Sequence, residues 1–322
     1  MKAKYTIVLL YAVAFFAVVS CKKSSKALSD DTTTGTDLYD KTQYVTGAVI
    51  YGSNKYTRII VGSMDSPIIL SSPHDGTMEP DNIPDRTNPN AETVRDIYAT
   101  DLTFRIADSL EKKTGLRPHI IINMLSRKKM DPNRSLEDAY LTHNDAIQAW
   151  KDYQNFITIA RQIVIEHIGN GLYLDMHGHG HDKARIEVGY LLSKNELNST
   201  DADINSMASE SSIYAIAKSS SASFSQLIRG DNALGTLLAN NNCPAVPSKQ
   251  DPKPNTDSYF NGGYCTLTYG SKSGGTISAI QLETPGTNRN TSSIRQISGG
   301  RIANAVISYM KVHYNMDLAK TQ

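Results

Sequence analysis

The stretch PIILSSPHDGTMEP, residues 67 to 80, decides how the fold is built. An apolar run over 67–71 is followed closely by a histidine, an aspartate, a glycine and a glutamate. A short apolar run bounded by turn residues is typical of a buried strand. The stretch therefore predicts a strand that delivers His74 to the carboxyl edge of a sheet, where ligands bind in open α/β sheets. Taken alone, His74 fits a satisfied structural histidine better than a metal ligand, so the rest of the sequence has to supply its partners.

The same alternation of apolar runs and segments of helical period continues along the chain and indicates an α/β domain. We expect strands at 48–51, 57–62, 67–71, 119–124, 172–176, 186–191, 265–269 and 276–282. We expect helices at 91–114, 136–168 and 292–313, with another near 223–239. Residues 44–322 should form one three-layer α/β/α domain with a mostly parallel, mixed sheet. Residues 240–263 are rich in Pro, Asn and Gly and should form a long loop.

The N-terminus has the pattern of an export signal. A short basic start and an apolar run over 5–19 are followed by Val19-Ser20-Cys21, which resembles the lipobox of bacterial lipoproteins. Residues 1–21 are thus expected to be a lipoprotein signal peptide with Cys21 as the lipidated residue, and the polar stretch 22–43 a flexible tether. An uncleaved anchor with an incidental cysteine is the alternative. We expect an exported lipoprotein of the cell envelope that contacts the membrane only through its lipid.

Charge and cysteine content narrow the function classes. The formal net charge is +1 and no basic cluster follows the tether, so nothing favours nucleic-acid binding. Export to an oxidising compartment makes Cys243 and Cys265 candidates for a disulfide, with two separate buried thiols as the alternative.

A second histidine-rich stretch, LYLDMHGHGHD at 172–182, also follows an apolar run. In extended backbone His177 and His181 would lie roughly 13 Å apart, too far for one metal unless the glycines fold the loop. A metal is bound more easily by one or two of these histidines together with a ligand from elsewhere in the chain. Gly76 permits a bend that brings Glu79 beside His74, so that His74, Glu79 and His177 would form a His₂Glu set for catalytic Zn²⁺.

Other interpretations of these two stretches stay open. Asp75 and Asp175 are expected to orient the metal-binding histidines rather than to bind the ion. His177, His179 and His181 could instead build a structural metal site.

Two further stretches supply charged groups. RKKMDPNRS, residues 127–135, carries Arg127 and Arg134, whose planar guanidinium groups can grip a carboxylate. AIQLETPG, residues 279–286, ends an apolar run at Glu283. A metalloenzyme needs a general base near its water, and Glu283 is the candidate; a salt-bridged core carboxylate is the alternative.

The order PHDGTMEP, DPNR, LYLDMHGH and IQLE resembles the N-formylglutamate amidohydrolase family and the phage-type poly-γ-glutamate hydrolases. Both are similar to the zinc carboxypeptidase superfamily, and the resemblance spans about residues 66 to 312. It implies that superfamily's fold, a zinc-dependent amidohydrolase acting on C–N bonds, and a small-molecule or peptide substrate with a free carboxylate. A non-catalytic binding lipoprotein and an envelope amidase acting on peptidoglycan peptides are the alternatives.

The resemblance also implies a role for each motif. His74, Glu79 and His177 would hold zinc, and Glu283 would be the catalytic base. Asn133 and Arg134 would clamp the substrate carboxylate, and Arg127 would polarise the scissile carbonyl. The carboxypeptidase spacing His-x-x-Glu is not matched, because Thr77 stands at that position.

The loop 240–263 is a candidate wall of the substrate cleft. Tyr259, Asn261 and Tyr264 are then expected near the substrate, since tyrosine combines an apolar ring with a polar tip. A Cys243–Cys265 bridge would close this loop at its base. A surface loop without catalytic importance is the alternative.

Overall fold

The computed structural model describes residues 39–89 and 91–319. The expected signal peptide and lipidated Cys21 lie outside this part of the chain. Within the described residues no helix has the length and apolar character needed to cross a membrane. Tyr39 is already buried and its hydroxyl donates to Glu166 Oε2 at 2.9 Å. The end of the stretch 22–43, which we expected to be a tether, therefore lies against the domain.

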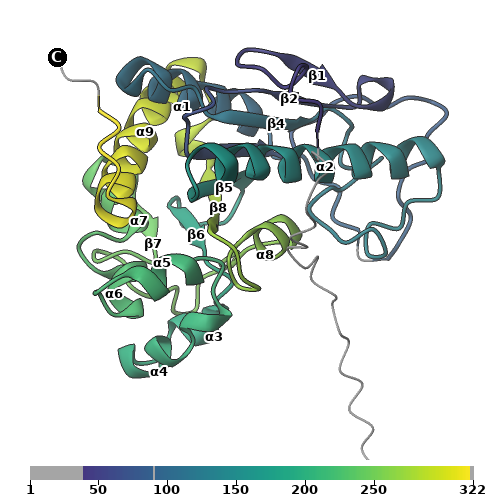
Figure 1. Ribbon diagram of the computed structural model, residues 1–322. Helices are drawn as coiled ribbons and strands as arrows, with labels where there is room; N and C mark the ends of the chain where they lie inside the picture. Colours follow the sequence, from purple (N-terminus) through teal and green to yellow (C-terminus); the bar gives the residue numbers. More distant parts are fainter. Residues whose placement is uncertain (1–38, 90, 320–322) are drawn as a thin grey trace, which may run out of the picture. The chain divides into compact units, whose positions relative to one another are not determined.

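The centre of the domain is an eight-stranded mixed sheet with strand order β1-β2-β4-β3-β5-β8-β6-β7 (Figure 1). Its central strands β4, β3, β5 and β8 are parallel, whereas β2 runs antiparallel to β4 on one side of this group and β6 runs antiparallel to β8 on the other. The strands are β1 Val49–Tyr51, β2 Thr57–Ile60, β3 Ile68–Ser72, β4 His119–Asn123, β5 Gly171–His179, β6 Ile186–Gly189, β7 Ala245–Val246 and β8 Ile277–Pro285.

Helices cover both faces of the sheet and form the two outer layers of the domain (Figure 1). On one face α1 and α9 lie side by side, and shorter helices extend this layer over β6 and β7; α2 and α8 cover the other face. The helices are α1 Ala99–Thr114, α2 Asn144–His167, α3 Lys194–Leu197, α4 Asp201–Ser206, α5 Tyr214–Ser219, α6 Phe224–Arg229, α7 Leu234–Asn240, α8 Tyr264–Tyr269 and α9 Ser292–Tyr314. The expected three-layer α/β/α class is confirmed.

The central strands are buried on both faces, which explains their continuous apolar runs. In β3 the side chains of Ile68 and Leu70 enter the core beneath α1 and α9, while Ile69 enters the core beneath α2. In β5 Leu172 and Tyr173 divide between the two cores in the same way. The period-2 geometry of a strand thus feeds two separate cores from one apolar run.

Four expected elements differ clearly from the structure, the first being the helix expected at 91–114, which begins only at Ala99. Residues 265–269 form helix α8 rather than a strand. The helix expected at 136–168 begins only at Asn144, and the helix expected near 223–239 is two helices, α6 and α7. Tertiary contacts explain α8, in which Cys265, Thr266 and Tyr269 are buried. Residues three and four positions apart lie on the same side of a helix, so a short helix buries Tyr269 together with Cys265 and Thr266.

Candidate metal centre

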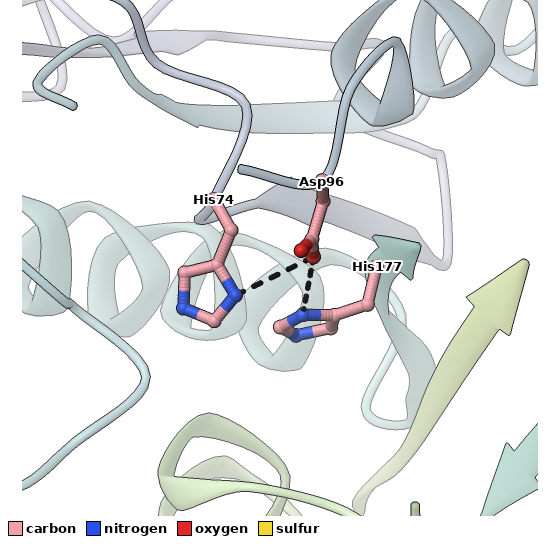
Figure 2. A group of neighbouring side chains, drawn as sticks. All are labelled: His74, Asp96 and His177. Carbon is pink, nitrogen blue, oxygen red and sulfur yellow. Dashed lines mark hydrogen bonds and ion pairs between the residues drawn. The ribbon is translucent and has the colours of Figure 1, made fainter. Parts of the chain in front are cut away.

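Three side chains from separate parts of the chain meet at the carboxyl edge of the central strands (Figure 2). His74 follows β3, His177 lies in β5, and Asp96 lies in the segment before α1. β3 and β5 are parallel neighbours, so their ends meet at one edge. All three side chains are buried. The expectation that His74 and His177 come together is met.

The distances around Asp96 suit a tetrahedral cation. Asp96 Oδ2 lies 3.1 Å from His177 Nδ1 and 3.4 Å from His74 Nδ1 (Figure 2). Ligand atoms of a tetrahedral zinc lie about 3.3 Å apart, because its bonds are about 2.0–2.1 Å long. His74 Nδ1 is buried and makes no hydrogen bond with any described residue. A buried ring nitrogen left in this way fits a metal ligand, and so does the donor set of two imidazoles and a carboxylate.

The distal nitrogen of each histidine is held by a further carboxylate. Asp131 Oδ1 lies 2.7 Å from His74 Nε2, and Asp175 Oδ2 lies 3.0 Å from His177 Nε2. Carboxylate–histidine pairs of this kind fix the ring orientation of metal ligands and raise their basicity. The expected orienting role of Asp175 therefore agrees with its position.

The pKa values show a centre that favours positive charge. Burial lowers the pKa of His177, but Asp175, Glu283 and Asp96 outweigh it and hold the pKa well above its ordinary value. Burial raises the pKa of Asp96, yet its hydrogen bond with His177 and its closeness to His74 bring that pKa well below the usual range. For Asp131, burial also raises the pKa, and His74, Arg127 and Arg86 more than offset it. A bound cation would replace the proton of His177.

Glu283 lies beside the candidate ligand His177. In the β5–β8 ladder it pairs with His177, and its Oε1 lies 3.9 Å from His177 Nδ1. Its Oε2 is buried and has no hydrogen-bond partner among the described residues. Burial raises its pKa to about 8. A carboxylate with a free, buried oxygen and a pKa near neutrality has the properties of a general base.

Arg127 also reaches the centre. Its Nε lies 3.1 Å from Asp131 Oδ2 and its guanidinium lies 3.9 Å from Asp96 Oδ1. The guanidinium is thus within a few ångströms of the candidate ligands, as its expected role requires.

Glu79 does not join this centre, which corrects the expected His₂Glu set. Its carboxylate is 47% exposed and pairs with Lys128 Nζ at 3.4 Å. The backbone after Gly76 runs beside the segment that follows β4 instead of turning back, because Met78 forms a parallel bridge with Leu125. The carboxylate beside His74 and His177 belongs instead to Asp96.

Asp75 has a different partner from the one expected. Its carboxylate accepts hydrogen bonds from the backbone amides of Tyr98 and Thr100 and pairs with Arg95. It therefore stabilises the N-terminus of α1, where the helix dipole and free amides favour negative charge, and does not orient a histidine.

The expected carboxylate clamp is only partly at the centre. Asn133 is buried, with Nδ2 3.3 Å from His177 Nε2 and Oδ1 accepting from the Cys265 amide at 2.8 Å. Arg134 is exposed, and its backbone oxygen accepts a hydrogen bond from Trp150 Nε1 at 3.0 Å. Tyr264 packs its ring on Trp150 at 5.9 Å. The structure brings Asn133 to the metal centre but not Arg134 or Tyr264.

The expected disulfide is absent. Cys243 and Cys265 are both free and buried. Cys243 belongs to the core beneath α1 and α9, whereas Cys265 belongs to the core on the other face of the sheet. The loop expected at 240–263 packs on β6 through Tyr259, whose hydroxyl donates to Val188 O at 2.7 Å.

A second group of possible ligands, His179, His181 and Glu187, lies nearby. Both ring nitrogens of His179 are already engaged, with the Arg185 carbonyl at 2.9 Å and the His181 amide at 3.1 Å. His181 Nδ1 lies 2.7 Å from Glu187 Oε1. These contacts satisfy the histidines without an ion, so the first group is the better metal site, and the structure does not gather His177, His179 and His181 around one point.

Asp96 and Asp131 are the candidate site residues that the sequence interpretation missed. Asp131 lies inside the DPNR motif, to which the sequence interpretation gave importance without assigning a role to Asp131 itself. Asp96 lies in a segment without regular structure that the sequence pattern assigned to a helix. Only its distance from the histidines in the fold identifies it.

Comparisons with known proteins give few relatives. No protein-family model matches the chain, and no curated protein is similar to it in sequence. Among solved structures, N-formylglutamate amidohydrolase from Ralstonia eutropha JMP134 is similar with a TM-score of 0.46 and 11% identity, covering 78% of this chain and 95% of that chain. A gene product of Agrobacterium tumefaciens is similar with a TM-score of 0.40 and 11% identity, covering 78% of this chain and 94% of that chain. Because both TM-scores are below 0.5, the chemistry of the site is derived from this chain's own residues.

Proposed function

We propose that the protein is a metal-dependent amidohydrolase that cleaves an amide bond of an N-acyl amino acid or a carboxylate-bearing peptide. The proposal is carried by one observation: a buried general-base candidate, Glu283, stands 3.9 Å from a histidine of a cluster with zinc-like spacing. A centre that only bound a ligand would not need a free carboxylate oxygen at this place.

The residues have separate tasks in the proposed reaction. His74, Asp96 and His177 would hold the ion. A zinc ion there would lower the pKa of a water molecule towards about 7 and polarise the substrate carbonyl. Glu283 accepts the proton of the attacking water and passes it to the leaving nitrogen. Arg127 offers a fixed cation for the negative charge that develops on the carbonyl oxygen.

The carboxylate specificity, the lipid anchor and the envelope location of the protein are parts of this proposal that rest on the sequence motifs. Arg134 is exposed, so a substrate carboxylate would have to lie at the protein surface to reach it. Cys21 would anchor the chain, and a glutamyl or peptidoglycan-derived amide at the envelope would be the substrate.

The test uses purified protein with bound metal measured by mass spectrometry, and products analysed from N-acyl-glutamates, poly-γ-glutamate and muropeptides. Chelation should abolish turnover and zinc should restore it. Glu283→Gln should keep the metal and lower kcat by about 10²–10⁴-fold. Turnover that is unchanged by a chelator, or full activity in Glu283→Gln, would refute the mechanism. Metal binding without turnover of any substrate would favour the binding lipoprotein.

A further inference from the structure

A cavity of about 420 Å³ lies beside the loops that carry His74 and Asp96, and the proposed mechanism does not use it. Its walls come from β2, β4, the start of α1 and the segments around residues 75–78 and 95–98. None of the candidate metal ligands lines it, nor does Glu283. The volume lies within the range of about 300–1,000 Å³ that is typical of small-molecule sites.

The walls are mostly apolar, and one of the arginines in them has no acidic partner among the described residues. Tyr98, Phe104, Ile122 and Met124 supply aromatic and aliphatic surface. Arg95 is neutralised by Asp75 at 2.7 Å, and Asp101 is paired with Arg295. The charges of these lining residues therefore cancel within the protein.

Arg58 has no such partner. Its guanidinium lies over the Phe104 ring at 5.7 Å, and no described residue forms a hydrogen bond or ion pair with it. Its Nε is buried and unsatisfied. Buried donors in native proteins are nearly always paired, so an N–H of this kind beside an open cavity indicates a missing acceptor.

We propose that this cavity binds a small organic monocarboxylate with an aromatic or aliphatic body, whose carboxylate pairs with Arg58. A planar guanidinium matches a carboxylate in geometry and charge. The apolar walls take the body of the ligand, and the single guanidinium without an acidic partner in the described part of the chain matches a single carboxylate. The site does not depend on the metal centre or on the proposed hydrolysis.

The probe is 3-phenylpropionate, titrated into the chelator-treated full-length protein by calorimetry. Saturable binding at one site is expected. Arg58→Gln should weaken it about 10-fold or more, which is the usual effect of removing a charge-assisted hydrogen bond. Arg58→Lys retains the cation and should retain more affinity than Arg58→Gln. Arg161, which lies over Tyr269 at the same 5.7 Å on the other face of the sheet, provides the control, because Arg161→Gln should leave binding unchanged.

A comparison of probes makes the test independent of any variant's folding. The uncharged 3-phenylpropionamide should bind the unaltered protein about 10-fold more weakly or worse. Equal binding of acid and amide, no binding of the acid, or the same affinity in Arg58→Gln would overturn the proposal. So would binding that appears only when the protein is loaded with zinc, since the carboxylate would then be on the metal.

Discussion

Glu283 gives the metal-free protein a pH dependence with a definite sign. Burial raises its pKa from 4.5 to about 8, so the native state holds this proton more tightly than the unfolded chain. The contribution of Glu283 to the free energy of unfolding is therefore fully present below about pH 4.5 and is lost as the pH rises through about 8. Glu283→Gln removes this titration.

The prediction is therefore that chelator-treated Glu283→Gln gains stability relative to the unaltered chain as the pH rises from 5 to 9. Urea unfolding at pH 5, 7 and 9 measures the difference in the free energy of unfolding. A difference that stays constant over this range would show that Glu283 does not titrate as its burial implies. Glu79→Gln is the control, because Glu79 is exposed and its pKa is lowered by Ser126 and Lys128.

At the scale of elements, the contact between α1 and α9 depends on a glycine. A Cβ at Gly299 would lie 2.6 Å from Arg105 Cβ and 2.7 Å from the Arg105 carbonyl carbon, whereas a Cβ at Gly300 would meet nothing within 4 Å. Gly299 thus allows the two helices to pack closely, while Gly300 only weakens the helix.

Two adjacent substitutions should then have opposite effects. Gly299→Ala should destabilise the protein by about 1–3 kcal/mol, because the two helices must move apart. Gly300→Ala should stabilise it by up to about 1 kcal/mol, since alanine is the better helix former. Chemical denaturation of both variants measures this, and equal shifts of the same sign would show that the helices do not pack as described.

The cysteines test the arrangement of α8. Cys265 lies on the α8 face of the sheet and its Sγ donates to Pro132 O at 3.4 Å, while Cys243 contacts Asn288 on the opposite side. Alkylation of the denatured, unreduced protein should label both residues, as peptide mass spectrometry would show. A Cys243–Cys265 cross-linked peptide would contradict this arrangement.

The elements that sequence reasoning found are those that local pattern dictates. β3, β4 and β8 are apolar runs buried on both faces, and α9 begins and ends within a residue of its expected bounds. The element whose type it mistook, α8, is short, and its conformation is set by its tertiary contacts. A six-residue apolar segment suits a buried strand or a buried helical turn equally well, so its sequence alone does not decide between them.

At the scale of the whole molecule, the candidate metal centre depends on contacts that local sequence patterns do not reveal. His74 and His177 were predictable, because each follows or ends an apolar run and parallel strands end at one edge. Asp96 was not, since the helical pattern of 91–114 placed it in a helix, whereas its hydrogen bonds with β5 hold it beside the histidines. Gly178 N donates to Asp96 Oδ2 at 3.1 Å, a contact between residues far apart in the chain. Glu79, the nearer carboxylate in sequence, faces solvent instead.

The most direct test is to compare the zinc content of Asp96→Asn and Glu79→Gln, each purified and dialysed against the same zinc buffer. Both changes remove one carboxylate charge and keep a similar size, so they form a matched pair. The structure predicts that Asp96→Asn loses most of its bound zinc, as His177→Ala should, while Glu79→Gln retains the zinc content of the unaltered protein. Zinc lost from Glu79→Gln and kept in Asp96→Asn would contradict the metal centre described here.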